Sequence, residues 1–196
     1  MADTYLTIKS PSKGIYKEKM SKFLAFAHPV KTPQEAKAIV ADYAKEYYDA
    51  RHVCWAYMIG SDRKDFLSSD NGEPSGTAGK PILGQINSFG LTDIVIVVVR
   101  YFGGIKLGTS GLIVAYREAA KTAIEAAEII ECHDMVTVEF TFPYLAMNQV
   151  MRLVKNSGAE ISNQSFDNTC SMALTIRADH GQSLRTALED IDGVTL

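Results

Sequence analysis

Short segments rich in β-branched and aromatic residues recur along the 196-residue chain, and several of them alternate apolar and polar side chains. A period of two is typical of strands that bury one face. The pattern predicts strands at 5–8, 14–18, 23–27, 53–59, 66–67, 93–101, 135–142, 159–166 and 170–178. The segment 93–101 is apolar on both faces, so we expect it in the centre of a sheet.

Apolar residues spaced three and four apart predict helices between these strands. The helices are expected at 33–48, around 82–89, and at 110–130, 144–156 and 182–191. Thr32 and Pro33 are residue types that open a helix, and Gly158 is the type that ends one. The helix 110–130 is rich in alanine, leucine and glutamate, and we expect it to end a first domain.

The pattern changes after residue 132. The elements then follow the order strand, helix, strand, strand, helix, with a short final strand at 194–196. This order is typical of a small ferredoxin-like unit. The sequence therefore predicts an α+β protein of two domains, residues 1–132 and 133–196.

Composition limits the classes of protein that the chain can be. A net charge of −3 and a pI near 5.8 argue against a surface coated in basic residues, although a local basic groove is compatible with both values. The three cysteines form no C-x-x-C motif, which is typical of a reducing compartment. No signal-peptide or membrane-helix pattern is present, so we expect a cytoplasmic protein without a membrane partner.

Two glycine-rich loops carry the candidate chemistry, since nine of the 14 glycines lie between Gly72 and Gly111. We name residues 70–81 the first glycine loop and residues 100–111 the second glycine loop. Each loop runs into a helix, whose free N–H groups and dipole attract an anion. A phosphate or carboxylate is therefore expected on both loops. The predicted binding residues are Gly76, Thr77, Gly79, Lys80, Arg100, Gly103, Gly104, Lys106, Thr109 and Ser110.

Two known motifs are close to these loops without matching them. A P-loop needs glycine where the chain has Pro74, and serine or threonine where it has Pro81. A nucleophile elbow needs glycine where the chain has Leu112. Ser110 is better explained as the N-cap of the following helix.

Asp70 and Glu73 are the catalytic candidates, as an acid–base pair or as ligands of a magnesium ion that a phosphate shares. The alternative, which we favour, is that they cap turns or form salt bridges with Lys80, Arg100 or Lys106. Two carboxylates without histidine make a weak transition-metal site, so no metal and no cofactor is predicted.

Arg51 and His52 precede the aromatic residues Trp55 and Tyr57. Basic residues beside aromatic rings could clamp nucleic acid. The competing interpretation places Trp55 in the core, because tryptophan is usually largely buried. Both interpretations stay open on the sequence alone.

The sequence resembles the YigZ/IMPACT family through four stretches: HVCWAY, SDNGEPSGTAGKPIL, VVVRYFGGIKLGTSGL and AYREAA. The resemblance covers essentially the whole chain. It implies a first βαβ domain like that of a ribosomal small-subunit protein and of domain four of elongation factor G. It also implies a second domain like the ferredoxin-like last domain of that factor.

Three functions are compatible with these observations. The first is a translation-linked protein that contacts RNA, the ribosome or another phosphate-bearing ligand through the two loops. The second is an enzyme for a small phosphorylated or carboxylated substrate, with Asp70 or Glu73 as general base. The third is a scaffold that docks a protein partner on the exposed sheet face of the C-terminal domain.

Overall fold

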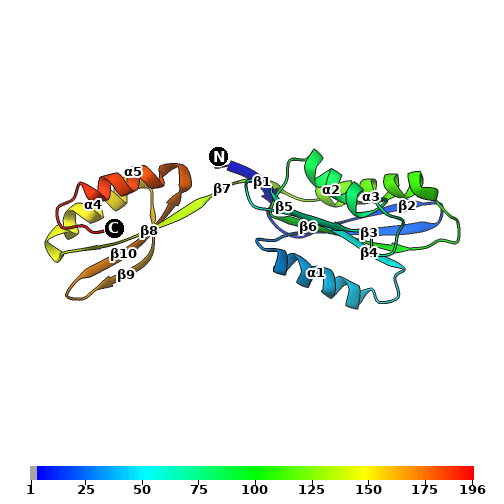
Figure 1. The fold of residues 1–196 in the computed structure, drawn as a ribbon, viewed down its shortest axis with the longest axis horizontal. Helices are drawn as coiled ribbons and strands as arrows, with labels where there is room; N and C mark the ends of the chain where they lie inside the picture. The colour runs from blue at the N-terminus through cyan, green and yellow to red at the C-terminus, as the bar shows by residue number, and fades with distance from the viewer. Residues whose placement is uncertain (1–3) are drawn as a thin grey trace. The chain divides into compact units, whose positions relative to one another are not determined.

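The computed structural model describes residues 4–196 (Figure 1). The chain divides into two compact units, one extending to Cys132 and one from His133 to Leu196. Each unit packs helices against a sheet around its own hydrophobic core, which confirms the predicted α+β class. None of the helices within residues 4–196 combines the length and the apolar character needed to cross a bilayer.

The first unit is built on a five-stranded sheet in which every neighbouring pair is antiparallel. In spatial order the strands are β2 (Ser12–Glu18), β3 (Ser21–Pro29), β6 (Ile94–Tyr101), β4 (His52–Ile59) and β5 (Asp65–Ser69). The central strand β6 is buried from Ile94 to Arg100. It is apolar on both sides because helices cover both faces of the sheet, as the sequence predicts.

Helix α1 (Pro33–Glu46) lies on one face of this sheet, and α2 (Gly79–Ser88) and α3 (Gly108–Glu125) lie on the other (Figure 1). Helix α1 begins where expected, because the Thr32 side chain accepts a hydrogen bond from the Glu35 N–H. Its aromatic face packs on β3, where Tyr43 stacks on Phe26.

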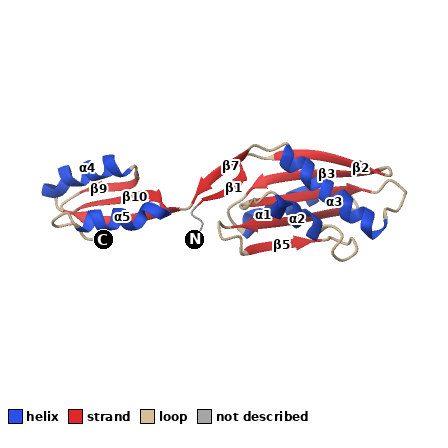
Figure 2. Cartoon of the chain, turned by 90° about the horizontal axis from the view of Figure 1, so that it is seen from above, coloured by secondary structure: helices blue, strands red, loops and turns tan. Residues whose placement is uncertain are grey.

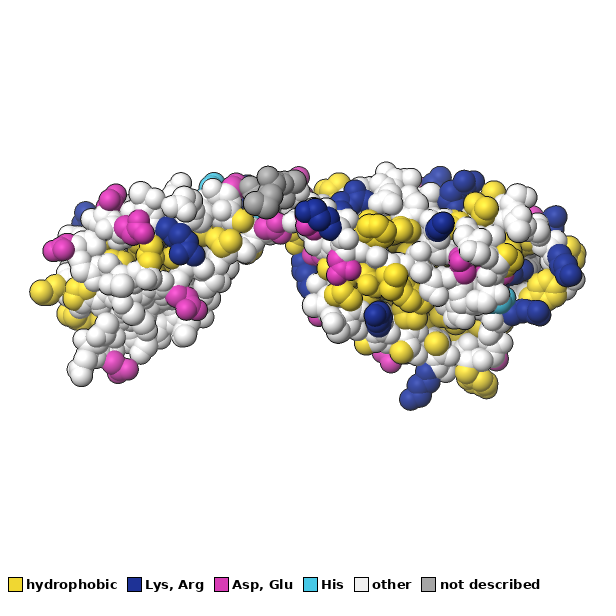
Figure 3. All heavy atoms as spheres, viewed as in Figure 1, with side chains coloured by type: hydrophobic (Ala, Val, Ile, Leu, Met, Phe, Trp, Pro, Cys, Tyr) yellow, Lys and Arg dark blue, Asp and Glu magenta, His cyan; other side chains and the backbone are white. Residues whose placement is uncertain are grey.

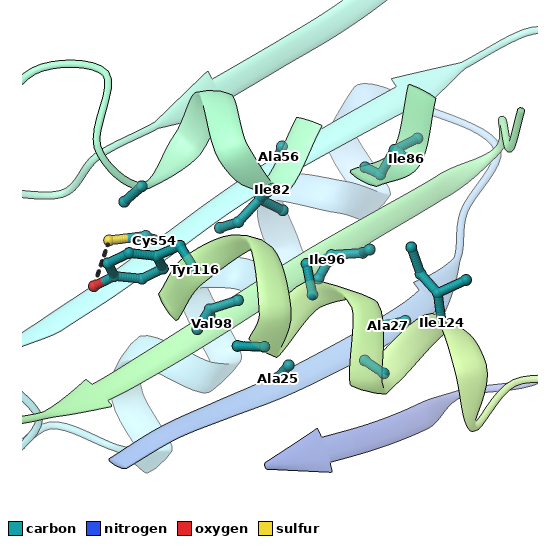
Figure 4. Packing of buried hydrophobic residues seen from close by; sticks show 14 of the residues in the cluster. Ala25, Ala27, Cys54, Ala56, Ile82, Ile86, Ile96, Val98, Tyr116 and Ile124 are labelled. Carbon is teal, nitrogen blue, oxygen red and sulfur yellow. Dashed lines mark hydrogen bonds between the residues drawn. The ribbon is translucent and has the colours of Figure 1, made fainter. Parts of the chain in front are cut away.

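Small residues bring α3 close to the sheet. Alanines of α3 pack over Ala25 and Ala27 of β3, while Ile82 and Ile86 of α2 fill the space beside them (Figure 4). Tyr116 is the largest side chain in this layer and its hydroxyl reaches Cys54. The helix therefore places the Tyr116 hydroxyl inside its buried interface with the sheet.

The predicted helix 110–130 is wrong at both ends. Helix α3 begins at Gly108 and ends at Glu125, and residues Ile129–His133 form β7. Strand β7 pairs with β1 (Thr4–Ile8) in a two-stranded sheet (Figure 2). Ile129 and Ile130 are β-branched and favour a strand, but the preceding alanine-rich run hides that boundary.

The second unit has a three-stranded antiparallel sheet in the order β8-β10-β9, with both helices on one face (Figures 1 and 2). Its elements are β8 (Met135–Phe142), the short 3₁₀ helix η1 (Tyr144–Ala146), α4 (Met147–Ser157), β9 (Glu160–Phe166), β10 (Cys170–Arg177) and α5 (Ala178–Glu189). Thr195 exchanges two backbone hydrogen bonds with Thr141 at 2.8 and 2.9 Å, so the chain end adds a bridge beside β8. This order is that of a ferredoxin-like unit.

The sheet face away from α4 and α5 carries a shallow pocket of about 370 Å³. Glu139, Thr141, Asn163 and Ser171 are among its polar lining residues. Nothing in this lining selects one partner, so docking of a protein at the C-terminal domain stays a prediction.

Candidate phosphate-binding site

A pocket of about 440 Å³ lies at the end of the first unit where β6 leaves the sheet. Its lining comes from the start of β4, the first glycine loop, and the second glycine loop with the start of α3. The lining residues are Arg51, His52, Gly72, Glu73, Pro74, Arg100, Phe102, Lys106, Leu107, Gly108, Thr109 and Leu112. Lys, Arg and hydrophobic side chains share this end of the unit (Figure 3).

A buried ion pair lines the inner part of the pocket. Nη1 of Arg100 donates to Oε1 of Glu73, and the Tyr116 hydroxyl donates to the same oxygen at 2.7 Å. His52 approaches the other carboxylate oxygen, with Nε2 3.7 Å from Oε2. Oε1 of Glu73 therefore accepts from two buried side chains of the protein itself, which favours the salt-bridge role over that of a general base.

Arg100 keeps one donor that the protein does not satisfy. The residue is only 5% exposed, and its Nε makes no hydrogen bond to any group within residues 4–196. A buried donor without a partner is costly and rare.

His52 is held in place from the first glycine loop. Its Nδ1 lies 2.7 Å from the backbone oxygen of Asn71, and the Asn71 side chain donates to the Val53 carbonyl at 2.8 Å. Because a carbonyl only accepts, Nδ1 carries the proton and Nε2 faces Glu73. These bonds tie the loop to β4 and set one wall of the pocket.

The N-terminus of α3 opens onto the same pocket. Gly108 begins the helix with a φ of +73°, a conformation that glycine adopts without strain. Leu107 is the cap residue and supplies no side-chain hydrogen bond, and the first turn contains no acidic residue. The predicted N-cap Ser110 lies inside the first turn instead, so that prediction is wrong. The helix dipole therefore adds positive potential beside Lys106 and Thr109.

The first glycine loop uses its amides internally. The Asp70 carboxylate accepts the N–H groups of Gly76, Ala78 and Gly79 at 2.8, 3.1 and 2.9 Å. The expected anion on this loop is thus a side chain of the protein itself, at the start of α2. Asp70 does not line the pocket, which argues against its role as a general base there.

Other predicted binding residues also build the loops rather than the pocket. The Thr77 hydroxyl donates to the Pro74 carbonyl at 2.6 Å, and the exposed Lys80 lies outside the pocket lining. Gly103 packs on the backbone of Met20, and Gly104 follows it in the same loop. The structure brings together Arg51, His52, Glu73, Arg100, Lys106 and Thr109 of the predicted set.

Trp55 and Tyr57 lie away from this pocket. Their rings stack on each other at 5.9 Å and pack in the cluster under α1, on the opposite face of the sheet. The core interpretation of Trp55 therefore holds, and neither ring reaches the basic residues. Sequence reasoning missed two aromatic residues that do matter, Phe102 and Tyr116. Phe102 could have been found from its position in the sequence, because it is a large apolar residue between Arg100 and the pair Gly103-Gly104.

Cys54 lies beside the ion pair but is not poised to react. Burial, together with nearby Glu73 and Asp70, raises the pKa of the Cys54 thiol to about 12, so the thiol stays protonated near neutral pH. Within residues 4–196, no three His, Cys, Asp or Glu side chains gather as a metal ion would need.

Asp70→Asn is expected to destabilise the first unit at pH 7 by about 1–2 kcal/mol, because the amide has no charge and only one acceptor oxygen for the three backbone donors. Burial opposes ionisation of Asp70, but the three backbone donors and Lys80 outweigh it and lower the pKa of the carboxyl. A lowered folded-state pKa stabilises the fold above the unfolded value of about 3.9, and this contribution is lost as pH falls through the folded value. The difference from wild type should therefore shrink in acid.

Denaturant unfolding followed by the fluorescence of Trp55, the chain's single tryptophan, measures this effect. Asp42→Asn, at an exposed position of α1, is the matched control and should leave stability unchanged. Equal stability of Asp70→Asn and wild type at pH 7 would contradict the capping role.

Comparisons with known proteins show the family to which the chain belongs. The family model described as the Impact N-terminal domain matches residues 19–124, which include every residue of the pocket. A Haemophilus influenzae protein named "IMPACT family member" is 34% identical over 174 residues, covering 88% of this chain and 84% of that protein. The "IMPACT family member YigZ" of Escherichia coli is 40% identical over 124 residues, 62% of this chain and 61% of that protein.

A solved structure titled "Crystal structure of an hypothetical protein" superimposes with a TM-score of 0.75 at 29% identity. It covers 97% of this chain and 93% of that chain. The chain belongs to the IMPACT family, as its glycine-loop motifs indicate.

Proposed function

We propose that this chain is a phosphate-binding protein that contacts RNA of the translation machinery through the pocket between its two glycine loops. The observation that carries the proposal is the uncapped N-terminus of α3, which lines the same pocket as the cationic residues Arg51, Arg100 and Lys106. A phosphate would accept from the helix amides and pair with these cationic side chains at the same time.

Further positive charge surrounds the same position. Arg51 and Lys106 line the pocket with exposed side chains, whereas Glu73 is already neutralised by Arg100. A local cationic site on a chain of net charge −3 favours specific capture over general coating of nucleic acid. The family resemblance implies domains like those of a ribosomal small-subunit protein and of elongation factor G, which favours RNA and the ribosome as targets. A cytoplasmic location is part of this proposal.

Lys106→Ala is expected to weaken binding of a single-stranded RNA oligomer and to flatten its salt dependence. Loss of one phosphate contact reduces the slope of log K against log salt by about 0.7 for a single strand. Filter-binding titrations between about 50 and 200 mM salt resolve such a change.

Lys80→Ala is the matched control, because Lys80 is an exposed lysine of the first glycine loop outside the pocket. It should leave both affinity and slope close to wild type. An unchanged slope in Lys106→Ala, or an equal loss in both variants, would overturn the proposal.

A further inference from the structure

The cationic pocket has an exposed apolar wall. Phe102 lines the pocket and is 39% exposed, and Ile105 in the same loop is 49% exposed. Phe102 directly precedes Gly103, and Ile105 directly follows Gly104, in the second glycine loop. Exposed apolar groups beside a polar site often mark a contact surface for a ligand.

Two guanidinium groups hold the Phe102 ring. Cζ of Arg51 lies 5.4 Å from the ring centroid, and Cζ of Arg100 lies 5.7 Å from it. Each contact is within the range of a cation–π interaction. These contacts favour one orientation of the ring before any ligand binds, which reduces the entropy lost on stacking.

The pocket thus offers two kinds of recognition side by side. The start of α3, Arg100 and Lys106 suit a phosphate, and the Phe102 ring suits a flat aromatic group. Free phosphate or a simple carboxylate would contact only the phosphate-binding groups and not the Phe102 ring. A nucleotide supplies both an anion and a planar base, and about 440 Å³ lies within the size range of small-ligand pockets.

Resting on the proposed phosphate site, we infer that the pocket holds one unstacked nucleotide of single-stranded RNA, with its phosphate at the N-terminus of α3 and its base on Phe102. The bases of a duplex are paired and stacked, so none is free to lie on the ring. A single strand presents such bases, and aromatic side chains bind them with little sequence preference.

The test compares three probes at one salt concentration: a short single-stranded RNA, the same strand with abasic sugars, and the same strand in a duplex. The single strand should bind most tightly. Phe102→Leu should weaken it by about 5- to 150-fold, the range for loss of one stacked base, while binding of the abasic strand stays unchanged. Phe102→Tyr keeps the ring and should retain binding.

Phe66→Leu is the matched control, since Phe66 is an exposed phenylalanine of β5 outside this pocket. It should bind all three probes like wild type. Equal affinity for the normal and abasic strands, a preference for the duplex, or wild-type binding by Phe102→Leu would overturn the stacking inference while leaving the phosphate site intact. Failure of all three probes to bind would instead reject the proposed function itself.

Discussion

Glu73→Ala is expected to destabilise the first unit by about 3–5 kcal/mol, the range for breaking a buried ion pair by removing one partner. Its carboxylate accepts from Arg100 and Tyr116, and all three side chains are buried. Removal would leave the Arg100 charge uncompensated and the Tyr116 hydroxyl without its acceptor. The resulting loss of folding stability is much larger than the contribution of a single surface salt bridge.

Trp55 fluorescence during denaturant unfolding measures this loss in the first unit. Glu73→Gln is the matched control, because it keeps an acceptor for Tyr116 at the same position and should cost less. The double variant Glu73→Leu, Arg100→Met should recover stability relative to Glu73→Ala, since apolar replacement of a buried pair is often neutral. A Glu73→Ala protein within about 1 kcal/mol of wild type would contradict this account of the pair.

The effect of an added anion connects this pair to the pocket. Inorganic phosphate that binds the folded protein stabilises it in proportion to the logarithm of its concentration over Kd. In Glu73→Ala, phosphate can pair with Arg100 from the pocket side. We therefore expect phosphate to stabilise this variant more than wild type.

Much of the fold could be predicted because buried positions carry apolar residue types, which are visible in the sequence. Strand β6 is apolar on both faces since helices cover both, and α1 begins at a Thr-Pro pair that caps it. The order of elements after His133 was enough to indicate the ferredoxin-like arrangement of the second unit. Local pattern and global packing agree in these segments.

The C-terminal end of α3 could not be predicted from residue types. Alanine, glutamate and isoleucine continue past Glu125 without glycine or proline, so intrinsic propensity gives no stop signal. The chain leaves the helix there because residues Ile129–His133 pair with β1, a segment more than a hundred residues earlier. Such a long-range pairing cannot be read from local sequence.

The site was predictable as a set of residues but not as a set of partners. Arg100 and Lys106 of the second glycine loop line one pocket with Glu73 of the first, and Arg51, predicted separately as a nucleic-acid contact, joins them. The first loop's amides, however, bind Asp70, and Glu73 binds Arg100 and Tyr116. The acceptor that binds the amides of a glycine loop depends on which groups lie near it in the folded chain. Tyr116 was missed because it belongs to an alanine-rich helix, and that sequence indicates only packing.

Gly103→Ala is expected to destabilise the first unit by about 1–3 kcal/mol, the range for overpacking a well-packed site. An added Cβ would lie 2.0 Å from the carbonyl carbon and 2.1 Å from the oxygen of Met20. Both are backbone atoms of the turn between β2 and β3, so no side chain can rotate away. The second glycine loop must move instead, and it carries Phe102 and Lys106. We therefore expect weaker RNA binding together with the lower stability.

Gly84→Ala is the matched control, at an exposed position within α2 where nothing lies within 4 Å of the added Cβ. Alanine is favoured over glycine in a helix, so this variant should be more stable by up to about 1 kcal/mol and should bind RNA normally. The same chemical change thus has opposite signs at two glycines, because only Gly103 lies against another backbone. If Gly103→Ala were as stable as wild type, the second glycine loop would have to be looser than its contact with Met20 implies, and the fixed pocket on which the nucleotide proposal depends would lose its support.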